Sequence, residues 1–263
     1  MADAQATTTH DWNGDSGARW AANLERLDLM LQDFGDSAVA AAAAQPGERV
    51  LDIGCGSGTS TFMLADQVGP TGHVLGVDIS EQLVELARAA TPDAAPVDFR
   101  LADAATASFP AEVFDLLFSR FGVMFFDDPV AAFANMRGAL KPDGRVAFVC
   151  WRSAAENDWV RLPMTAIRDI VQPAPADPDA PGPFAFGNPE RLTDILATAG
   201  FADIEVKPFD NRLAYGRSDT LEKMRVFGTG PQYAKLGRAV RYRRADLDQY
   251  VTERLVASTS EAA

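Results

Sequence analysis

The sequence predicts an α/β domain whose doubly wound and mostly parallel sheet is covered by helices on both faces, followed by a short α+β appendage. Three observations predict the main domain. Short β-rich runs alternate with helically spaced segments from residue 49 to residue 151. The runs are almost continuously apolar, which is typical of parallel strands buried on both faces. A glycine cluster follows the first run directly, and ligands of such sheets lie at the carboxyl ends of the strands.

Each element follows from a local pattern. Residues 17–44 are predicted to form one or two helices because Leu24, Leu27 and Leu31 recur at helical spacing. Strands are predicted at residues 49–53, 73–77, 97–101, 114–119 and 145–151. Helices are predicted between them at residues 59–68, 81–90 and 131–140. Ser80 is expected to cap the helix after the second strand, and residues 141–144 are expected to turn into the fifth strand.

The pattern loosens after residue 151. A helix is predicted at residues 156–171, and a second helix at residues 189–199 ends at Gly200. A sixth strand is predicted at residues 201–209. The proline-rich stretch at residues 173–183 is either a surface connection or a lid over the ligand. We therefore interpret residues 151–190 as an insertion on the side of a second ligand.

Composition limits the class of protein. The chain has 263 residues, is 47% hydrophobic and contains 16 Phe, so it can bury a large core and is neither disordered nor fibrous. Its two cysteines, Cys55 and Cys150, make a disulfide framework unlikely to be the basis of the fold. We find no secretory signal in residues 1–14 and no apolar stretch of membrane-spanning length. The sequence thus predicts a cytoplasmic protein.

Charge divides the chain into two parts. The net charge is −13, which argues against broad electrostatic binding to nucleic acids or acidic membranes. Residues 1–213 contain 15 Lys and Arg against 31 Asp and Glu, a net charge of −16. Residues 214–263 contain 9 Lys and Arg against 6 Asp and Glu, a net charge of +3. The change of sign predicts a module boundary near residue 213.

The glycine cluster is the strongest functional signal. Gly54, Gly56 and Gly58 stand at a predicted strand-to-helix turn, where they let the backbone approach a ligand closely. A dinucleotide site has the pattern G-x-G-x-x-G, but Thr59 and the spacing of these glycines depart from it. Asp52, just before the turn, would repel a pyrophosphate and suits a ligand that carries an ammonium or sulfonium group. A dinucleotide-dependent oxidoreductase is therefore disfavoured.

Two further acids follow the next two predicted strands. Asp78 ends the second strand, 24 positions after Gly54, where a carboxylate can accept hydrogen bonds from ribose hydroxyls. Asp103 ends the third strand, where its carboxylate or the neighbouring amide can reach an adenine edge. Three acids at successive strand ends beside one glycine turn are more specific than any of them alone.

These motifs resemble those of class I S-adenosylmethionine-dependent methyltransferases. The resemblance rests on residues 52–58, 76–80, 102–104, 114–126 and 140–145, and it covers about residues 10–210. A segment from Trp12 to Trp20, of the form W-x-G-x-x-G-x-x-W, is similar to the bacterial small-molecule branch of the family. The resemblance implies S-adenosylmethionine as the cofactor and a small-molecule methyl acceptor.

The resemblance also implies a role for each position. The cofactor would be bound by Asp52 at its ammonium group, by the turn at its methionine and ribose portions, by Asp78 at its ribose and by Ile79 at its adenine. The cofactor set is Asp52, Gly54, Cys55, Gly56, Gly58, Thr59, Asp78, Ile79, Asp103, Ala104, Ser119, Arg120, Trp12 and Trp20. Ser119 and Arg120 would meet the methionine moiety through their backbone. Trp12 and Trp20 either cover the cofactor or the acceptor, or anchor a terminal helix.

Catalysis in this family consists mainly of alignment, because the sulfonium is already an activated methyl donor. The acceptor pocket is expected at Phe121, Met124, Phe125 and Trp151. No catalytic residue is assigned: His10 is a weak candidate for a base, and His73 opens a strand at the far end. Cys55 is interpreted as a small filler of the turn. No metal motif occurs in the sequence.

The tail allows two interpretations. Residues 239–243 could supply the seventh strand of a methyltransferase sheet. Alternatively, residues 220–225, 228–231 and 235–250 resemble the end of an excisionase-type winged helix-turn-helix domain, whose positive charge fits phosphate contact. A DNA-binding regulator with a nucleoside-sensing domain is thus the alternative function, and the tail could also serve a homodimer. We divide the chain into residues 1–45, a helical cover of the site, 46–213, the cofactor-binding domain, and 214–263, the basic tail.

Overall fold

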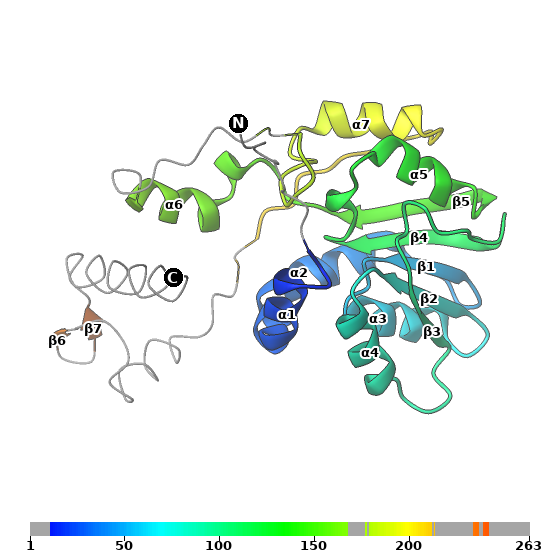
Figure 1. The fold of residues 1–263 in the computed structure, drawn as a ribbon, viewed down its shortest axis with the longest axis horizontal. Coiled ribbons are helices and arrows are strands. Elements are labelled where there is room, and N and C mark those ends of the chain that lie inside the picture. The colour runs from blue at the N-terminus through cyan, green and yellow to red at the C-terminus, as the bar shows by residue number, and fades with distance from the viewer. Residues whose placement is uncertain are drawn as a thin grey trace, which may run out of the picture. The chain divides into compact units, whose positions relative to one another are not determined.

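The computed structural model describes residues 11–167, 177, 179–211, 213, 234–236 and 239–241 (Figure 1). The chain forms two compact units, Met1–Leu213 and Ala214–Ala263. His10 and most of the tail segments that resemble a winged helix lie outside the described residues. The first unit contains the sheet and the candidate site.

The sheet of the first unit has five strands, all parallel to their neighbours. They are β1 (Arg49–Ile53), β2 (His73–Asp78), β3 (Val97–Leu101), β4 (Phe114–Arg120) and β5 (Leu140–Val149). Their order is β3-β2-β1-β4-β5, so the chain winds outward from β1 in both directions. The predicted doubly wound fold is confirmed. The strand order reverses between β1 and β4, and ligands of such sheets bind outside the carboxyl ends of the strands at this point.

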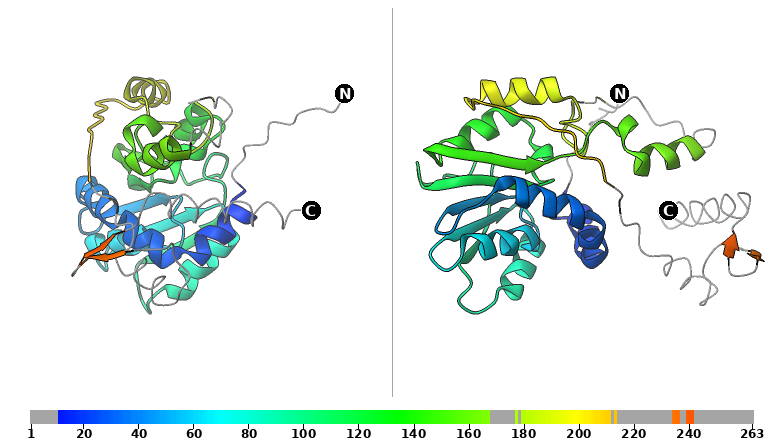
Figure 2. Two further views of the ribbon diagram at one scale, coloured as in Figure 1. Left: turned by 90° about the vertical axis from the view of Figure 1, so that its left-hand side faces the viewer. Right: turned by 180° about the vertical axis from the view of Figure 1, so that it is seen from behind.

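Helices cover both faces of this sheet (Figures 1 and 2). Their bounds are α1 (Asp15–Ala22), α2 (Leu24–Ala42), α3 (Thr59–Val68), α4 (Glu81–Ala90), α5 (Pro129–Arg137), α6 (Asp158–Ile167) and α7 (Pro189–Thr198). Short 3₁₀ turns occur at Val123–Phe125 and Ala154–Glu156. Helices α3 and α4 lie on one face with the C-terminal part of α2, and α5 and α7 lie on the other.

The core consists of two layers, one on each face of the sheet. Alternating strand residues fill them: Val50 and Leu116 face α2, α3 and α4, whereas Leu51 and Leu117 face α5 and α7. All four side chains are buried. Since burying one such side chain stabilises the fold by about 1.5–3 kcal/mol, these layers hold the strand ends in fixed register.

Most predicted bounds agree with the structure. β1, α3, α4 and β3 have the bounds expected from the sequence. The predicted turn at residues 141–144 lies within β5 instead, where the pairing passes from Phe114–Leu140 to Leu116–Arg145 and leaves four residues without a partner in the ladder. Helix α6 begins two residues later than predicted, and residues 168–171 of that prediction lie outside the described part.

The predicted sixth strand is wrong. Residues 201–209 run without regular structure, most of them are exposed, and Asp203 has a φ of 53°. A strand needs a neighbour for its backbone N–H and C=O groups. The tail residues that could supply one, β6 (Ala234–Leu236) and β7 (Ala239–Arg241), pair antiparallel with each other in a separate two-stranded sheet. The interpretation of residues 239–243 as the seventh strand of the main sheet is therefore wrong as well.

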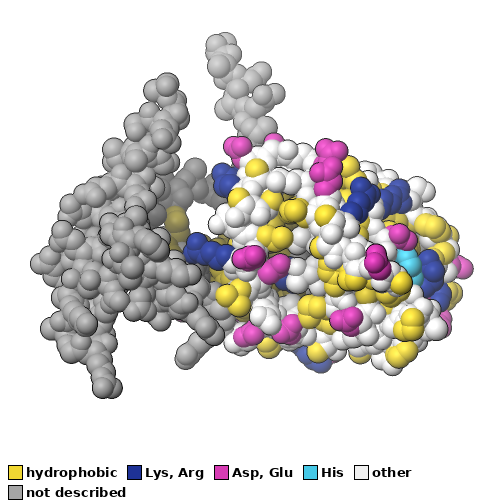
Figure 3. All heavy atoms as spheres, turned by 90° about the horizontal axis from the view of Figure 1, so that it is seen from below, with side chains coloured by type: hydrophobic (Ala, Val, Ile, Leu, Met, Phe, Trp, Pro, Cys, Tyr) yellow, Lys and Arg dark blue, Asp and Glu magenta, His cyan; other side chains and the backbone are white. Residues whose placement is uncertain are grey.

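The surface seen in Figure 3 carries acidic side chains that are scattered singly among apolar and neutral ones. None of the described helices is both long enough and apolar enough to cross a membrane. Within the same described ranges, His, Cys, Asp and Glu side chains form no group of three that could hold a metal ion.

Candidate functional site

The sheet order brings the predicted site residues to one edge. Because the strands are parallel, their carboxyl ends lie along a single line in the order β3, β2, β1, β4. Asp103 follows β3, Asp78 ends β2, the glycine turn follows β1 and Arg120 ends β4. A ligand lying along this line would meet two acids, the turn and the end of β4 in sequence.

The glycines of the turn have different reasons to be glycine. A Cβ at Gly54 would come within 2.6 Å of the Gly122 Cα, and one at Gly58 within 2.8 Å of the Phe99 ring. Both positions therefore serve close packing. A Cβ at Gly56 would meet nothing within 4 Å, although its φ of 55° also favours glycine. Gly56 thus borders open space, which is what a ligand-binding turn requires.

Asp78 ties the end of β2 to the glycine turn. Its Oδ2 accepts a hydrogen bond from the Gly56 backbone N–H at 2.8 Å, and its Oδ1 accepts one from the Ser80 N–H at 2.8 Å. Burial raises the pKa of this carboxyl. The next residue, Ile79, is 43% exposed, so its side chain offers an apolar face on which a flat ring can lie.

Asp52 is completely buried behind the turn. Its Oδ2 accepts hydrogen bonds from the hydroxyls of Ser60, at 2.8 Å, and Thr61, at 2.7 Å, in the first turn of α3. Its Oδ1 has no partner among the described residues. Burial raises the pKa of Asp52 to about 6, against the lowering effect of the two hydroxyls and of the Arg120 charge. Since none of the side chain is exposed, it would act on a ligand through its charge and through the turn.

The end of β4 is fixed by Ser119 and Arg120, which the sequence indicated, and by Asp28, which it did not. The Ser119 hydroxyl donates to the Ile53 carbonyl at 2.8 Å and accepts from the Gly122 N–H at 3.1 Å. The Arg120 guanidinium donates to Oδ1 of Asp28, in α2, at 2.5 Å. The Thr59 hydroxyl donates to the other oxygen of Asp28 at 2.8 Å. Asp28 was not predicted, because one aspartate on a helix carries no signal of its distant partners.

The N-terminal segment reaches the β2 end of this edge. The Asn13 side chain donates to the Ile79 carbonyl at 3.0 Å and accepts from the Glu81 N–H at 3.0 Å. It thereby satisfies the first backbone N–H of α4. Ser80 is the N-cap residue of α4, as the sequence predicts, although its side chain makes no capping hydrogen bond. The Ser80 hydroxyl is buried and makes no hydrogen bond to a described residue.

Both tryptophans of that segment contribute to its packing. The Trp12 ring lies 5.9 Å from that of Trp20 and 5.2 Å from that of Phe125 between ring centroids. Gly17 is packed so closely on this segment that a Cβ there would lie 2.0 Å from the Trp12 carbonyl oxygen. The segment therefore links α4 with the aromatic run after β4.

Asp103 and Ala104 lie at the β3 end in different environments. Asp103 is exposed, and its Oδ1 accepts a hydrogen bond from the Ala105 N–H at 2.9 Å. Ala104 is buried, and its carbonyl accepts a hydrogen bond from the Asn135 side chain at 3.1 Å. Asp103 therefore remains open to a ligand at this end.

The predicted acceptor residues lie in aromatic clusters beyond β4 and β5. Phe121 stacks on Trp151 with 4.5 Å between ring centroids, and Phe34 of α2 packs edge-on against both rings. Phe121 has a φ of 62°, a strained conformation for a bulky buried residue and one that clusters at functional sites. Met124 is buried and its sulfur accepts a hydrogen bond from the Trp151 N–H at 3.4 Å.

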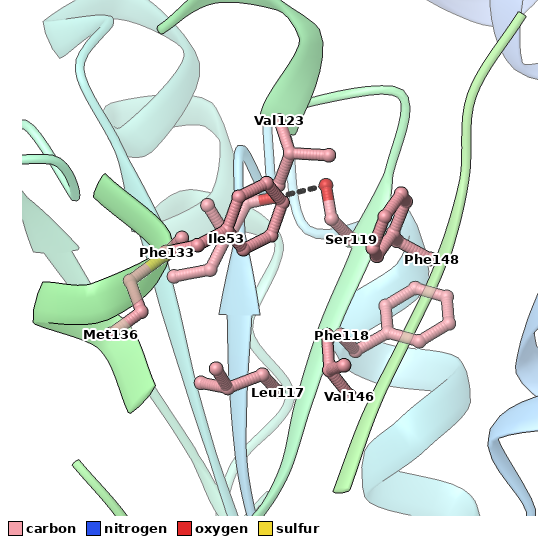
Figure 4. A pocket seen from close by; sticks show the side chains of 9 residues that line it. All are labelled: Ile53, Leu117, Phe118, Ser119, Val123, Phe133, Met136, Val146 and Phe148. Carbon is pink, nitrogen blue, oxygen red and sulfur yellow. Dashed lines mark hydrogen bonds between the residues drawn. The ribbon is translucent and has the colours of Figure 1, made fainter. Parts of the chain in front are cut away.

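Two other features do not form part of the ligand edge. The Cys55 thiol is buried, and burial raises its pKa well above the usual range, so it is a poor nucleophile. A pocket beneath the edge, with Ser119 as its polar residue, fits a packing gap better than a site for a charged nucleoside (Figure 4). It is lined by Ile53, Leu117, Phe118, Ser119, Val123, Phe133, Met136, Val146 and Phe148.

The sheet order, the glycine turn and the acid at the end of β2 together define a class I S-adenosylmethionine-dependent methyltransferase domain. More particularly, residues 51–148 match the family described as a methyltransferase domain. The resemblance drawn from the motifs is thus confirmed.

Curated relatives extend the match. Nocamycin O-methyltransferase from Saccharothrix syringae is 33% identical over 171 residues, which cover 61% of this chain and 61% of that protein. Aklanonic acid methyltransferase DauC from Streptomyces sp. (strain C5) is 41% identical over 104 residues, which cover 39% of this chain and 47% of that protein. The chain therefore spans less than two thirds of the length of these relatives.

Solved structures share the fold. A SAM-dependent methyltransferase from Aquifex aeolicus aligns with a TM-score of 0.53 at 20% identity and covers 70% of this chain and 87% of that chain. The [4+2]-cyclase SpnF aligns with the same TM-score of 0.53 at 22% identity and covers 75% of this chain and 68% of that chain. Because one of these neighbours is named a cyclase, the fold alone does not fix the reaction.

Proposed function

We propose that this protein transfers a methyl group from S-adenosylmethionine to a small-molecule acceptor. One observation carries the proposal. Gly56 borders open space at the point where its N–H is held by Asp78, between the carboxyl ends of β2 and β1. A turn of this kind with an acid at the next strand end suits a nucleoside, and the acid Asp52 behind it suits a cationic ligand.

The residues present fit the cofactor along its whole length. Asp78 can accept hydrogen bonds from ribose hydroxyls, because a carboxylate offers about four acceptor sites and the Gly56 and Ser80 N–H groups do not fill them. The exposed face of Ile79 would lie against the adenine, with Asp103 at its edge. Gly54 to Thr59 would line the methionine and ribose portions, and the negative charge of Asp52 would favour the ammonium group.

The contribution of the chain to the chemistry is alignment. When bound, S-adenosylmethionine supplies a methyl group on a positively charged sulfur, which needs no further activation. The glycine turn and Asp78 would fix the position of the donor, and Trp12 and Trp20 would cover it. The acceptor-side rings would exclude water and hold the acceptor in line, which is the main source of rate enhancement in such a reaction.

The acceptor side supports a flat, apolar acceptor. Its walls would be the rings of Phe121, Phe125 and Trp151 together with the Met124 thioether, and such surfaces bind planar molecules by stacking and burial. The curated relatives named for nocamycin and aklanonic acid are consistent with small-molecule acceptors. A base for a hydroxyl acceptor is not assigned, and His10 stays the candidate from the sequence.

Calorimetric titration of the full chain with S-adenosylmethionine, S-adenosylhomocysteine and NAD tests the proposal. We expect micromolar binding of both sulfur nucleosides and no heat with NAD, because Asp52 and Thr59 depart from a pyrophosphate site. Binding of NAD in place of the sulfur nucleosides, or silence from both sulfur nucleosides, would refute the cofactor assignment.

A further inference from the structure

Asp28 connects three parts of the site that are far apart in the sequence. It lies on α2, and its two carboxylate oxygens accept hydrogen bonds from Arg120, at the end of β4, and from Thr59, at the start of α3. The Arg120 side chain is 11% exposed and that of Asp28 is 25% exposed. One carboxylate thus joins Thr59, which follows the glycine turn after β1, to Arg120, which ends β4. These two residues lie 31 and 92 positions from Asp28 in the sequence.

A second feature of α2 serves the same side chain. Gly35 lies seven residues after Asp28, two helical turns along one face of α2. A Cβ at Gly35 would lie 3.1 Å from Cδ of Arg120. Gly35 therefore leaves room on α2 for the methylene groups of Arg120, and the Asp28 carboxylate binds its guanidinium. Together these two contacts restrict the position of the Arg120 side chain.

This arrangement leaves Arg120 with capacity for a ligand. Its guanidinium has five N–H donors, and within the described residues its head donates to a single carboxylate, that of Asp28. The glycine turn lies beside it, and the buried Asp52 is close enough for the Arg120 charge to lower its pKa. A positive group beside Arg120 is disfavoured, and a carboxylate is favoured.

We infer that Asp28 is a positioning residue for the methionine end of the cofactor, where it holds the Arg120 guanidinium toward the α-carboxylate of the ligand. This inference rests on the proposed function. It assigns a part in cofactor binding to α2, to which the sequence motifs assigned only a covering role. The adenosine end, held by Asp78 and Ile79, does not depend on Asp28.

The test uses two ligands that share the adenosine part. S-adenosylhomocysteine carries the α-amino and α-carboxyl groups, and 5′-methylthioadenosine lacks both. For Asp28→Asn, which keeps the size but not the charge, we expect S-adenosylhomocysteine to bind about tenfold more weakly, a loss typical of one hydrogen bond to a charged group. The affinity for 5′-methylthioadenosine should change less than about twofold. Calorimetry on the full chain measures both.

Two further variants separate positioning from folding. Asp33→Asn is the matched control, since Asp33 lies on the same helix and accepts a hydrogen bond from exposed Asn211; both affinities should stay as in the unmodified protein. Gly35→Ala leaves every charge in place and displaces the Arg120 stem, so it should reproduce the selective loss even where Asp28→Asn folds poorly.

Four outcomes decide the matter. A loss confined to S-adenosylhomocysteine in both Asp28→Asn and Gly35→Ala supports the inference. An equal loss for both ligands shows a general structural role and overturns it, as does no loss for either. If the unmodified protein binds neither ligand, the proposed function fails, and this result is distinct from the other three.

Discussion

The two sides of the candidate site are built by different physics. On the cofactor side, buried carboxylates hold the backbone of the turn: Asp78 binds the Gly56 N–H, and Asp52 binds two hydroxyls of α3. On the acceptor side, aromatic rings such as Phe121 and Trp151 pack face to face and edge to face. The buried carboxylates lower the stability of the fold because their charges are removed from water, whereas the packed rings raise it. Substitutions should therefore have opposite effects on the two sides.

Removing the buried charge at Asp52 should have the largest effect, and it should stabilise the protein. Because burial raises the pKa of Asp52 from 3.8 to about 6, the folded state holds this proton more tightly than the unfolded state. The contribution of Asp52 to stability is thus present below pH 3.8 and is lost as the pH rises to about 6. Asp52→Asn should not show this decrease in the free energy of unfolding, which amounts to about 3 kcal/mol.

Urea unfolding at pH 4 and pH 7.5 measures this difference. We expect the unmodified protein to lose stability relative to Asp52→Asn across this interval, and we expect the variant to bind S-adenosylhomocysteine more weakly. If the free energy of unfolding changed with pH by the same amount in the two proteins, the Asp52 charge would not destabilise the folded state.

Removing Asp78 should have the next largest effect, this time on binding. Asp78→Ala loses the ribose acceptor and the hydrogen bond that holds the Gly56 N–H. We expect a decrease of about 100-fold in affinity for S-adenosylhomocysteine, as for the loss of two hydrogen bonds to a charged group. Calorimetry measures this affinity, and circular dichroism should show an unchanged fold.

The matched control is Asp98→Ala. Asp98 lies on β3 in an exposed pair with His73, which opens β2 at the opposite end of the sheet. Its removal should leave the affinity unchanged. Equal affinities of the two alanine variants would remove Asp78 from the site.

Replacing an aromatic ring on the acceptor side should lower stability and leave cofactor affinity nearly unchanged. Trp151→Leu loses the stack on Phe121 and the edge contact with Phe34, which should lower the free energy of unfolding by about 2 kcal/mol. The affinity for S-adenosylhomocysteine should stay within about twofold, because the rings that Trp151 packs on among the described residues are those of Phe34, Phe121 and Trp159. Urea unfolding and calorimetry on the same variant measure both, and a large loss of cofactor affinity would contradict the division of the site.

The smallest effect is expected at Gly56, where the cost depends on the ligand. Gly56→Ala and Gly47→Ala both place a Cβ at a positive φ without a clash, since the nearest atom is beyond 4 Å in the first and at 3.6 Å in the second. Each should lose about 1 kcal/mol of stability. Gly47 lies before β1, at the opposite end, so a decrease of about tenfold in cofactor affinity is expected for Gly56→Ala alone. Equal affinities would place the ligand elsewhere.

The parts of the site that the sequence predicted are those with local signals. Gly54, Gly56 and Gly58 stand in one turn, and Asp78 directly ends an apolar strand, so spacing along the chain was sufficient to locate them. The motifs also carried the resemblance that the comparisons confirmed.

The missed residues depend on long-range contacts. Asp28 and Asn13 reach partners 31 to 92 residues away, and neither side chain differs in pattern from an ordinary polar residue on a helix or turn. Ser80 was correctly assigned as the N-cap residue of α4, but the sequence does not indicate that Asn13, 68 positions away, accepts the hydrogen bond from the Glu81 N–H. The wrong sixth strand has a similar cause, since a strand at a sheet edge is decided by its neighbour and not by its own residues.

A crystal structure of the full chain with S-adenosylhomocysteine tests the central claim most directly. We predict that the ribose hydroxyls bind the Asp78 carboxylate, that the adenine lies on Ile79, and that the methionine end lies over Gly56 toward Arg120. A nucleoside bound anywhere else, with Asp78 and Gly56 free of ligand contact, would contradict the account.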